Sequence, residues 1–371
     1  MGDVVLIPLS PSALRAVLAP AGEARGLPPA AFTDPAVLAW ERRALFAPGF
    51  FAASAADATR PGEWVRAPLG DDRLVVLCDA SMERALLRDV CLHRAMPLLD
   101  GDRGELTALT LECPYHRWRY GLDGALASPC GAGERSLRAG SLAGEGVALR
   151  AFEGVAAQGI WSRVPWLSAL STSALRRARR VSWDASANWK LLVQNFQESH
   201  HFPSVHPWLE ALTPWADSRS VTGGDGWLGG VMDLRPGVET VSTTGELRGR
   251  RRVAPASLGA RVHDAWLAPN LLTSLQPDYL LTYRLHPMRV DLTRVVAEVW
   301  VHAETRDDQG LDEVYAFWDR VNAEDRSVCE AQQRALPAAR EAGRYCESED
   351  GVRAFDQWLA TAMLDAAGET R

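Results

Sequence analysis

The sequence predicts an α+β protein with two domains: a small antiparallel β domain, then a larger domain in which helices cover an antiparallel sheet. Two patterns carry this prediction. Short strand-like runs separated by turn residues fill positions 46 to 155, and longer strand-like runs after position 212 lead into an amphipathic helix. A chain of 371 residues is also long enough to bury two ordinary cores.

The composition excludes several classes of protein. Hydrophobic residues make up 47% and charged residues 23% of the chain, which is typical of a globular protein. A net charge of −7 argues against nucleic acid or an anionic membrane as the main partner. No apolar run reaches membrane-spanning length, and the N-terminus lacks a basic segment followed by an apolar one. We therefore expect a cytoplasmic protein with neither partner.

Residues 1–45 are rich in Ala, Pro and Leu, and we expect them to form an N-terminal arm that packs on the larger domain. Ser10 is a suitable cap for a short helix over Ala13–Leu18, and Pro35 is a suitable first residue for another. The expected strands of the small domain are Val65–Pro68, Leu74–Cys78, Leu106–Leu111 and Trp118–Tyr120.

Cysteine and histidine are paired in a distinctive way within the small domain. The six cysteines are Cys78, Cys91, Cys113, Cys130, Cys329 and Cys346. In a cytosolic chain of this size, metal binding is a better default for spaced cysteines than a disulfide framework. Nineteen residues separate Cys91-Leu-His93 from Cys113-Pro-Tyr-His116.

This spacing suits a [2Fe–2S] cluster, because two thiolates can hold one iron while two imidazoles hold the other. Each predicted loop contributes one ligand of each kind. A Cys₂His₂ zinc site is the alternative, but it normally pairs C-x-x-C with H-x₃₋₅-H. We therefore predict the cluster.

The stretch Asn188–Pro207 reads as a buried helix that contains His201 and His206. Glu198 and His201 are three residues apart and would share a helical face. Pro203 would end or bend the helix, so that the second imidazole can turn toward the first. Two imidazoles and a distant carboxylate form a facial triad for non-heme Fe(II). Ordinary core or surface histidines remain the alternative at this point.

The larger domain supplies a candidate for the third ligand. Its expected strands are Gly229–Leu234, Asp264–Leu267, Asn270–Leu275, Tyr279–His286 and Arg294–His302, and its expected long helix is Leu311–Arg334. Asp325 lies on the apolar side of that helix, where a carboxylate is costly unless it is paired or binds metal. Glu324, or a buried ion pair with Arg326 or Arg334, is the alternative. We expect the basic run Arg176–Arg180 to be a solvated helix end.

Two motifs resemble those of Rieske non-heme iron oxygenases, the family of ring-hydroxylating oxygenase large (α) subunits. Cys91–Arg94 and Cys113–Gly124 resemble the Rieske domain, and Asn188–Pro207 resembles the mononuclear iron motif. The resemblance runs from about Trp40 to Trp358. It implies a Rieske [2Fe–2S] domain over 46–155, with Cys91, His93, Cys113 and His116 as cluster ligands, and a helix-grip-like catalytic domain with mononuclear iron over 156–371.

The resemblance also implies roles for individual residues. His201, His206 and Asp325 are the implied iron ligands. Glu198 is the implied carboxylate that bridges His201 to His116 of a neighbouring copy in a head-to-tail homotrimer. Asn195 is implied to lie near the iron.

Four residues depart from the family pattern, and two of these departures, at positions 95 and 117, lie in the cluster loops. The other two are Gln194, where Glu is common, and His200, where an aromatic or aliphatic residue is common. Ala95 and Arg117 stand where the family usually has glycine. These glycines shape the loops that carry the cluster ligands. The two departures in the loops therefore call into question the conformation of the loops, while the ligands themselves are unaffected.

The implied function is that of the terminal oxygenase component of a Rieske system. Electrons would come from NAD(P)H through a separate ferredoxin or flavin reductase, because the chain shows no glycine-rich dinucleotide fingerprint. Many ring-dihydroxylating members have Asp at the position of Glu198, so the glutamate resembles the carnitine, choline and glycine betaine monooxygenase branch more closely. This favours hydroxylation or oxidative demethylation of a small polar substrate, with a quaternary ammonium compound as the candidate.

An aromatic cage would suit such a substrate. The candidates for it are Trp208, Trp215, Trp227, Trp266 and Tyr283. The runner-up function is dihydroxylation or oxidation of an aromatic ring or arylamine. Outside the enzyme class, the alternative is a Rieske electron carrier with a vestigial iron site.

Overall fold

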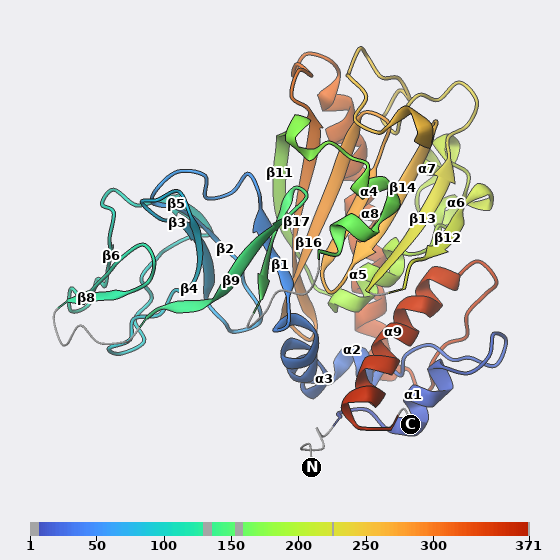
Figure 1. Cartoon of the computed structure of the whole chain (residues 1–371). Coiled ribbons are helices and arrows are strands. Elements are labelled where there is room, and N and C mark those ends of the chain that lie inside the picture. Colours follow the sequence, from blue (N-terminus) through green and yellow to red (C-terminus); the bar gives the residue numbers. More distant parts are fainter. Residues whose placement is uncertain (1–6, 129–135, 153–158, 225, 370–371) are drawn as a thin grey trace. The chain divides into compact units, whose positions relative to one another are not determined.

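The computed structural model describes residues 7–128, 136–152, 159–224 and 226–369. It divides the chain into two compact units (Figure 1). One unit combines residues 1–41 with residues 160–371, and the other consists of residues 42–159. Within the described residues, no helix is both long enough and apolar enough to span a membrane.

Apart from a short π-helix over Arg42–Phe46, the named elements of the smaller unit are antiparallel strands. Its larger sheet has the order β1-β10-β9-β4-β3-β2-β5. These strands are β1 (Phe50–Ser54), β2 (Glu63–Arg66), β3 (Leu74–Cys78), β4 (Arg84–Arg88), β5 (Arg103–Glu105), β9 (Arg138–Glu145) and β10 (Ala148–Phe152). A second sheet consists of β6 (Leu111–Glu112), β7 (Arg119–Tyr120) and β8 (Leu126–Ser128).

One expected strand in this unit is wrong. Residue 106 has no regular structure, residues 107–110 form bends, and only Leu111 begins a strand. The segment connects β5 of the larger sheet to β6 of the smaller one, so it leaves one set of backbone partners before it meets the next. Leu109 accordingly is 55% exposed.

The larger unit contains one antiparallel sheet with the order β11-β17-β16-β15-β14-β13-β12. Its strands are β11 (Leu175–Ala185), β12 (Arg219–Thr222), β13 (Trp227–Asp233), β14 (Arg261–Leu267), β15 (Leu271–Leu275), β16 (Tyr279–Arg289) and β17 (Leu292–His302). The expected strands after position 228 are therefore confirmed. The basic run Arg176–Arg180 is not a helix end, because it lies in the edge strand β11 and is paired with carboxylates such as Glu298 and Asp319.

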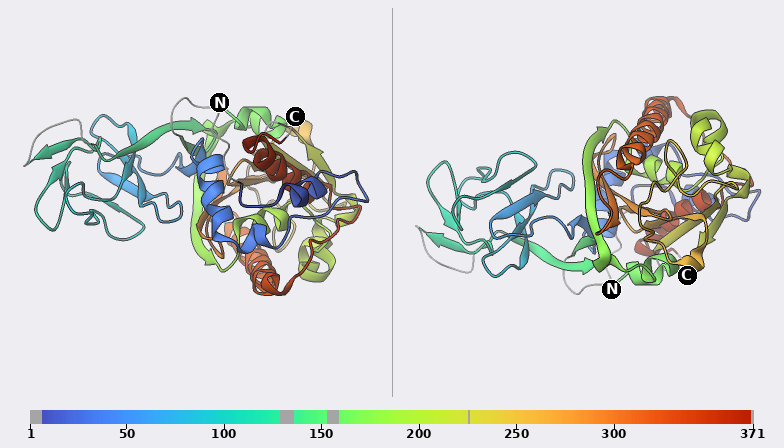
Figure 2. Two further views of the ribbon diagram at one scale, coloured as in Figure 1. Left: turned by 90° about the horizontal axis from the view of Figure 1, so that it is seen from below. Right: turned by 90° about the horizontal axis from the view of Figure 1, so that it is seen from above.

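Helices cover the sheet of the larger unit, as Figure 2 shows. They are α1 (Pro11–Val17), α2 (Ala30–Thr33), α3 (Pro35–Glu41), α4 (Pro165–Ser168), α5 (Trp189–Phe196), α6 (Phe202–Val205), α7 (Pro207–Leu212), α8 (Leu311–Ala335) and α9 (Asp350–Ala366). Helix α5 contacts β16 and lies between α8, which contacts β11, and α9, which contacts β12 and β13. The expected helices over 311–334 and after Ser10 and Pro35 are confirmed.

Helix α5 is anchored to the N-terminal arm by a buried ion pair. The Lys190 ammonium lies 2.7 Å from a carboxylate oxygen of Glu41 at the end of α3, and the Trp189 indole N–H donates to the other oxygen at 2.8 Å. All three side chains are shielded from solvent. A buried ion pair tolerates little displacement, because removing either partner leaves a charge uncompensated. The arm therefore fixes the helix that leads into the candidate site.

Candidate active site

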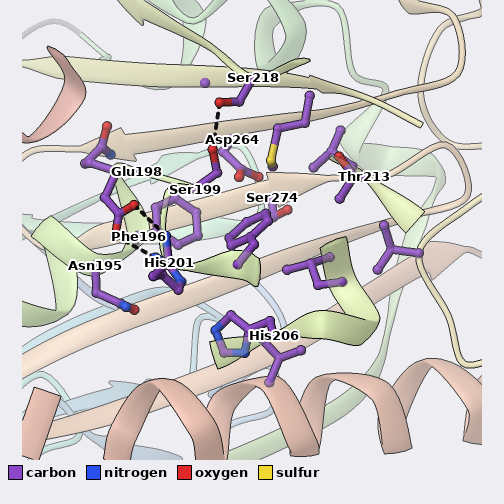
Figure 3. A pocket seen from close by; sticks show the side chains of 18 of the residues that line it. Asn195, Phe196, Glu198, Ser199, His201, His206, Thr213, Ser218, Asp264 and Ser274 are labelled. Carbon is purple, nitrogen blue, oxygen red and sulfur yellow. Dashed lines mark hydrogen bonds and ion pairs between the residues drawn. The ribbon is translucent and has the colours of Figure 1, made fainter. Parts of the chain in front are cut away.

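A pocket lies between the sheet and the helices of the larger unit, and His201 and His206 line it (Figure 3). Its walls come from the segment between α5 and α7, from β13–β15 and from α8. It offers about 90 Å³ to the centres of water-sized molecules. Since one water needs roughly 10–15 Å³ by this measure, there is room for several waters or one small organic molecule.

The chain that carries the two histidines is more broken than the sequence suggested. Helix α5 ends at Phe196, and α6 begins only at Phe202, so Glu198 and His201 do not share a helical face. Pro203 stands in the first turn of α6, where a missing N–H has no cost, and so it helps to start this helix. His206 separates α6 from α7 with φ −123° and ψ 61°.

His201 is held from both sides of its ring. Its Nδ1 lies 2.5 Å from a carboxylate oxygen of Glu198, and its Nε2 lies 3.6 Å from Oδ1 of Asp325. The other Glu198 oxygen accepts the backbone N–H of His201 at 3.2 Å. Glu198 thus fixes the position and the orientation of this imidazole.

His206 is held in the same manner by a different carboxylate. Its Nδ1 lies 2.8 Å from Glu324, and its Nε2 lies 2.7 Å from Oδ1 of Asp325. Burial acts to lower the pKa of His206, but the contacts with Asp325 and Glu324 outweigh burial and raise that pKa. The site therefore attracts positive charge.

These residues fit a metal ion. One ligand atom from each of His201, His206 and Asp325 lies within 4.8 Å of the others. The Nε2 atoms of both imidazoles face the same Asp325 oxygen, while both Nδ1 atoms are occupied by carboxylates, as is usual for metal-binding histidines. Glu324, the alternative ligand, lies on the outer nitrogen of His206 and also accepts from Arg320 at 2.9 Å.

The smaller unit brings the four predicted cluster ligands together in two pairs. The thiol of Cys91 hydrogen-bonds with that of Cys113, and the rings of His93 and His116 have centroids 4.7 Å apart. This sorting suits a cluster in which thiolates hold one iron and imidazoles the other. Both cysteines are buried and both histidines are exposed.

The two cluster loops have the same backbone pattern. In each loop, the cysteine carbonyl accepts from the N–H four residues later, which belongs to Ala95 or Arg117, at 3.0 Å. Each cysteine N–H donates at 2.8 Å to the carbonyl five residues later, which belongs to Met96 or Trp118. Ala95 and Arg117 adopt φ values of 56° and 60°, so both loops keep a left-handed conformation without glycine.

A tyrosine supports the first of these loops. The Tyr120 hydroxyl lies 3.1 Å from the Cys91 sulfur and accepts the Leu92 N–H at 3.0 Å. Burial acts to raise the pKa of the Cys91 thiol, but hydrogen bonds with Tyr120, the loop backbone and Cys113 outweigh burial and lower that pKa. The thiolate that a metal requires is therefore favoured here.

Comparison with known proteins identifies the family. The family model for the ring hydroxylating alpha subunit (catalytic domain) matches residues 172–365, just over half of the chain. The chain belongs to this family. The model for the Rieske [2Fe–2S] domain matches residues 50–136.

The alpha subunit has relatives among monooxygenases. It is 23% identical to the glycine betaine monooxygenase oxygenase subunit of Chromohalobacter salexigens, over 91% of this chain and 86% of that protein. It is 26% identical to the chloroplastic choline monooxygenase of Spinacia oleracea, over 93% of this chain and 80% of that protein.

Solved structures share its fold. One is a quaternary ammonium Rieske monooxygenase that oxidises carnitine and transfers electrons between subunits. It matches with a TM-score of 0.78 at 18% identity, over 96% of this chain and 100% of that one. Naphthalene 1,2-dioxygenase from Rhodococcus sp. matches with a TM-score of 0.74 at 18% identity, over 97% and 98%.

The protein is therefore an oxidoreductase that uses O₂, and it is the terminal oxygenase component of a Rieske system. Its cofactors are a Rieske [2Fe–2S] cluster and a mononuclear iron. Its electrons come from a separate reductase. The α+β fold class, the enzyme class and both cofactors that the sequence predicted are confirmed.

The pocket of the alpha subunit contains aromatic residues other than those that the sequence analysis proposed. Phe196, Phe202 and Trp318 line it. Trp208 is 57% exposed, and Trp266 is buried against Phe355. The other candidates also lie elsewhere: Trp215 packs on His200, Trp227 packs on Trp166, and Tyr283 lines a neighbouring cavity.

Other residues are placed as follows. Asn195, at the end of α5, lines both the pocket and that neighbouring cavity, together with Asp325. His200 is exposed and lies away from the iron ligands, with its Nδ1 3.5 Å from the Cys346 sulfur. Five cysteines of the described chain are free, and Cys130 lies outside the described residues.

Among the polar residues of the pocket, sequence reasoning missed Thr213 and Asp264. Asp264 was recognised only as part of a strand. The available signal was a carboxylate at the start of the predicted strand Asp264–Leu267, whose other residues are apolar.

Proposed function

We propose that this oxygenase carries out monooxygenation, by hydroxylation or oxidative demethylation, of a small organic ammonium compound. The observation that carries the proposal is that the ligand atoms of His201, His206 and Asp325 converge at a pocket with room for one small molecule. The named activities of relatives, on choline, glycine betaine and carnitine, supply the substrate class.

In this proposal, His201, His206 and Asp325 hold the mononuclear iron. When bound there, Fe(II) supplies open coordination positions at which dioxygen is activated beside the substrate. Glu198 and Glu324 accept the Nδ1–H of His201 and His206, which leaves each Nε2 lone pair directed toward Asp325. Asn195 contributes a polar group next to Asp325 where the two cavities meet.

Cys91 and Cys113 would bind one iron of the cluster, and His93 and His116 the other. The exposure of both imidazoles supports electron transfer from this end of the cluster to another copy of the chain. We propose a head-to-tail homotrimer in which Glu198 bridges His201 to His116 of a neighbouring copy. The reductase would be a ferredoxin or flavin protein that uses NAD(P)H.

We also propose the domain division that the resemblance implies, with an arm over 1–45, a Rieske domain over 46–155 and a catalytic domain over 156–371. The compact units provide partial support, because residues 1–41 belong with residues 160–371. The cytoplasmic location stays a prediction.

Iron analysis of the purified holoenzyme, together with oxygen uptake driven by NADH and a generic reductase, tests the proposed function. We expect about three irons per chain and substrate-dependent uptake with choline, glycine betaine or carnitine. His201→Ala should retain about two irons and lose uptake. About two irons in the unmodified protein would indicate an electron carrier, and uptake with only naphthalene or aniline would favour the aromatic-oxidation alternative.

A further inference from the structure

One acidic side chain of the pocket has no cationic partner. Three carboxylates line the pocket: Glu198, Asp264 and Asp325. Glu198 and Asp325 contact the iron-site imidazoles. Within the described residues, Oδ1 of Asp264 is shielded from solvent and has no hydrogen-bond partner. Asp264 is therefore the carboxylate of this lining that does not contact an iron-site imidazole.

Asp264 lies on β14 and is oriented by its neighbour on β15. Ser274 is its directly paired residue on the adjacent strand β15 and hydrogen-bonds with its carboxylate. The Gln276 amide N–H donates to the Ser274 oxygen at 2.9 Å, which leaves the Ser274 hydroxyl free to donate to Asp264. Figure 3 shows Asp264 and Ser274 near the strands of the sheet, and His206 nearer to the helix at the bottom of the view.

The rest of the lining offers acceptors and no spare positive charge. Oε1 of Gln276 and Oγ1 of Thr213 are buried without a hydrogen-bond partner in the described part of the chain. Arg219 is the cation of the lining, and it is paired with Asp233 at 3.1 Å. Burial raises the pKa of Asp264 to about 7, although the bond from Ser274 acts in the opposite direction. A positive ligand would offset the cost of ionising this carboxylate.

There is open space beside Asp264. Gly230 faces it from β13, and a Cβ at Gly230 would meet only the backbone oxygen of Arg219, at 3.9 Å. Phe196, Phe202 and Trp318 line the same pocket and provide aromatic surface. Aromatic surface with one carboxylate suits an organic cation, because ring faces and a negative charge both attract it.

We propose that Asp264 binds the positively charged head of the substrate, a small organic ammonium ion, and holds it in the pocket beside the iron ligands. This inference rests on the proposed function, since it identifies the group that would recognise that substrate class. Gln276 acts as a positioning residue through Ser274. The aromatic residues then contact the methyl groups of the head.

Binding calorimetry on the holoenzyme tests the charge requirement directly. The probes are choline and 3,3-dimethylbutan-1-ol, which has nearly the same shape but carries no charge. We expect the unmodified protein to bind choline more tightly, and Asp264→Asn to weaken choline binding by at least about tenfold with little effect on the alcohol. Asp264→Glu, which keeps the charge, should retain part of the preference.

Two controls make the result decisive. Asp291→Asn makes the same chemical change at an exposed position and should alter neither affinity. The absorption spectrum of the cluster and the iron content of Asp264→Asn should match those of the unmodified protein, which shows that the variant is folded and loaded.

The outcomes separate the inference from the function on which it rests. Equal choline affinity in Asp264→Asn and the unmodified protein, with ammonium-dependent oxygen uptake intact, would overturn the inference and leave the proposed function in place. Equal affinities of the unmodified protein for choline and for the alcohol would also overturn the inference. Failure of every ammonium compound in the uptake assay would overturn the proposed substrate class.

Discussion

The two candidate metal sites are constructed by different means. In the smaller unit, each ligand pair belongs to one short loop, and two backbone hydrogen bonds close that loop around its cysteine. In the larger unit, His206 and Asp325 are 119 residues apart, and carboxylate side chains orient the imidazoles. The cluster ligands therefore depend on local backbone conformation, whereas the iron ligands depend on the packing of α8 against the α5–α7 segment.

This difference implies that each site can be lost without the other. The largest expected effect tests this independence. Asp325→Ala removes the oxygen that both Nε2 atoms face, so the iron content should fall from about three to about two per chain, and oxygen uptake should fall to background. The cluster absorption spectrum should not change.

The reciprocal variant is Cys113→Ala, which should lose the cluster and keep about one iron per chain. Metal analysis and electron paramagnetic resonance of the two variants measure both contents. Loss of both metals in either variant would show that the sites depend on each other.

The next effect concerns the outer carboxylates. Glu324→Gln keeps all three proposed ligands but weakens the group that orients His206, so we expect about a 10- to 100-fold loss of iron affinity. Glu198→Gln should lower iron affinity similarly. In the proposed trimer, Glu198→Gln should also slow oxidation of the reduced cluster in a single turnover, which Glu324→Gln should not.

Iron titration and stopped-flow absorption distinguish these two carboxylates. Arg353→Gln, on α9, is a suitable surface control, because its partner Asp350 is exposed. Equal rates of cluster oxidation in the two glutamate variants would contradict the bridging role of Glu198.

The same contrast explains what could be predicted from the sequence. The cluster ligands lie in short motifs whose spacing carries the geometry, and helix α8 has a strong apolar stripe. The break between Phe196 and Phe202 was missed, because Pro203 suggested a single interruption later in the chain. Arg176–Arg180 was misassigned because its partners, such as Glu298, are more than 100 residues away.

The pocket was the least predictable region. Asp264 gains its setting from strand register, which places Gly230 on one side of it and Ser274 on the other. No local pattern encodes that register. The aromatic residues that line the pocket likewise depend on which helix faces the sheet, and tryptophan content alone does not show this.

A moderate effect concerns pH. Asp264 has a pKa raised to about 7, so it is neutral below that pH and ionised above it. Choline affinity should therefore fall as the pH decreases through 7, approaching about tenfold per unit, and this slope should flatten in Asp264→Asn. The other ionisable residues of the lining are Glu198, His201, His206, Arg219 and Asp325.

Because those residues are unchanged in Asp264→Asn, the difference between the two pH profiles isolates the contribution of Asp264. Calorimetry from about pH 5.5 to about pH 8.5, which brackets this pKa, measures that contribution to choline affinity. Parallel profiles would show that another group controls binding.

The smallest effect returns to the cluster loops. Ala95 adopts φ 56°, a conformation that costs a residue with a Cβ about 1–2 kcal/mol. Ala95→Gly removes this cost but adds about 0.4–1 kcal/mol of chain entropy to the unfolded state, so the net gain should be at most about 1.6 kcal/mol. Arg117→Gly should gain less, because it also loses the ion pair between Arg117 and Glu112 at 2.5 Å. Urea-induced loss of cluster absorbance in the full chain measures both. If Ala95→Gly instead destabilised the chain by more than the entropy difference, the alanine side chain would have to make a contact that outweighs the backbone strain. In that case side-chain packing, and not local backbone conformation, would hold the cluster ligands in place.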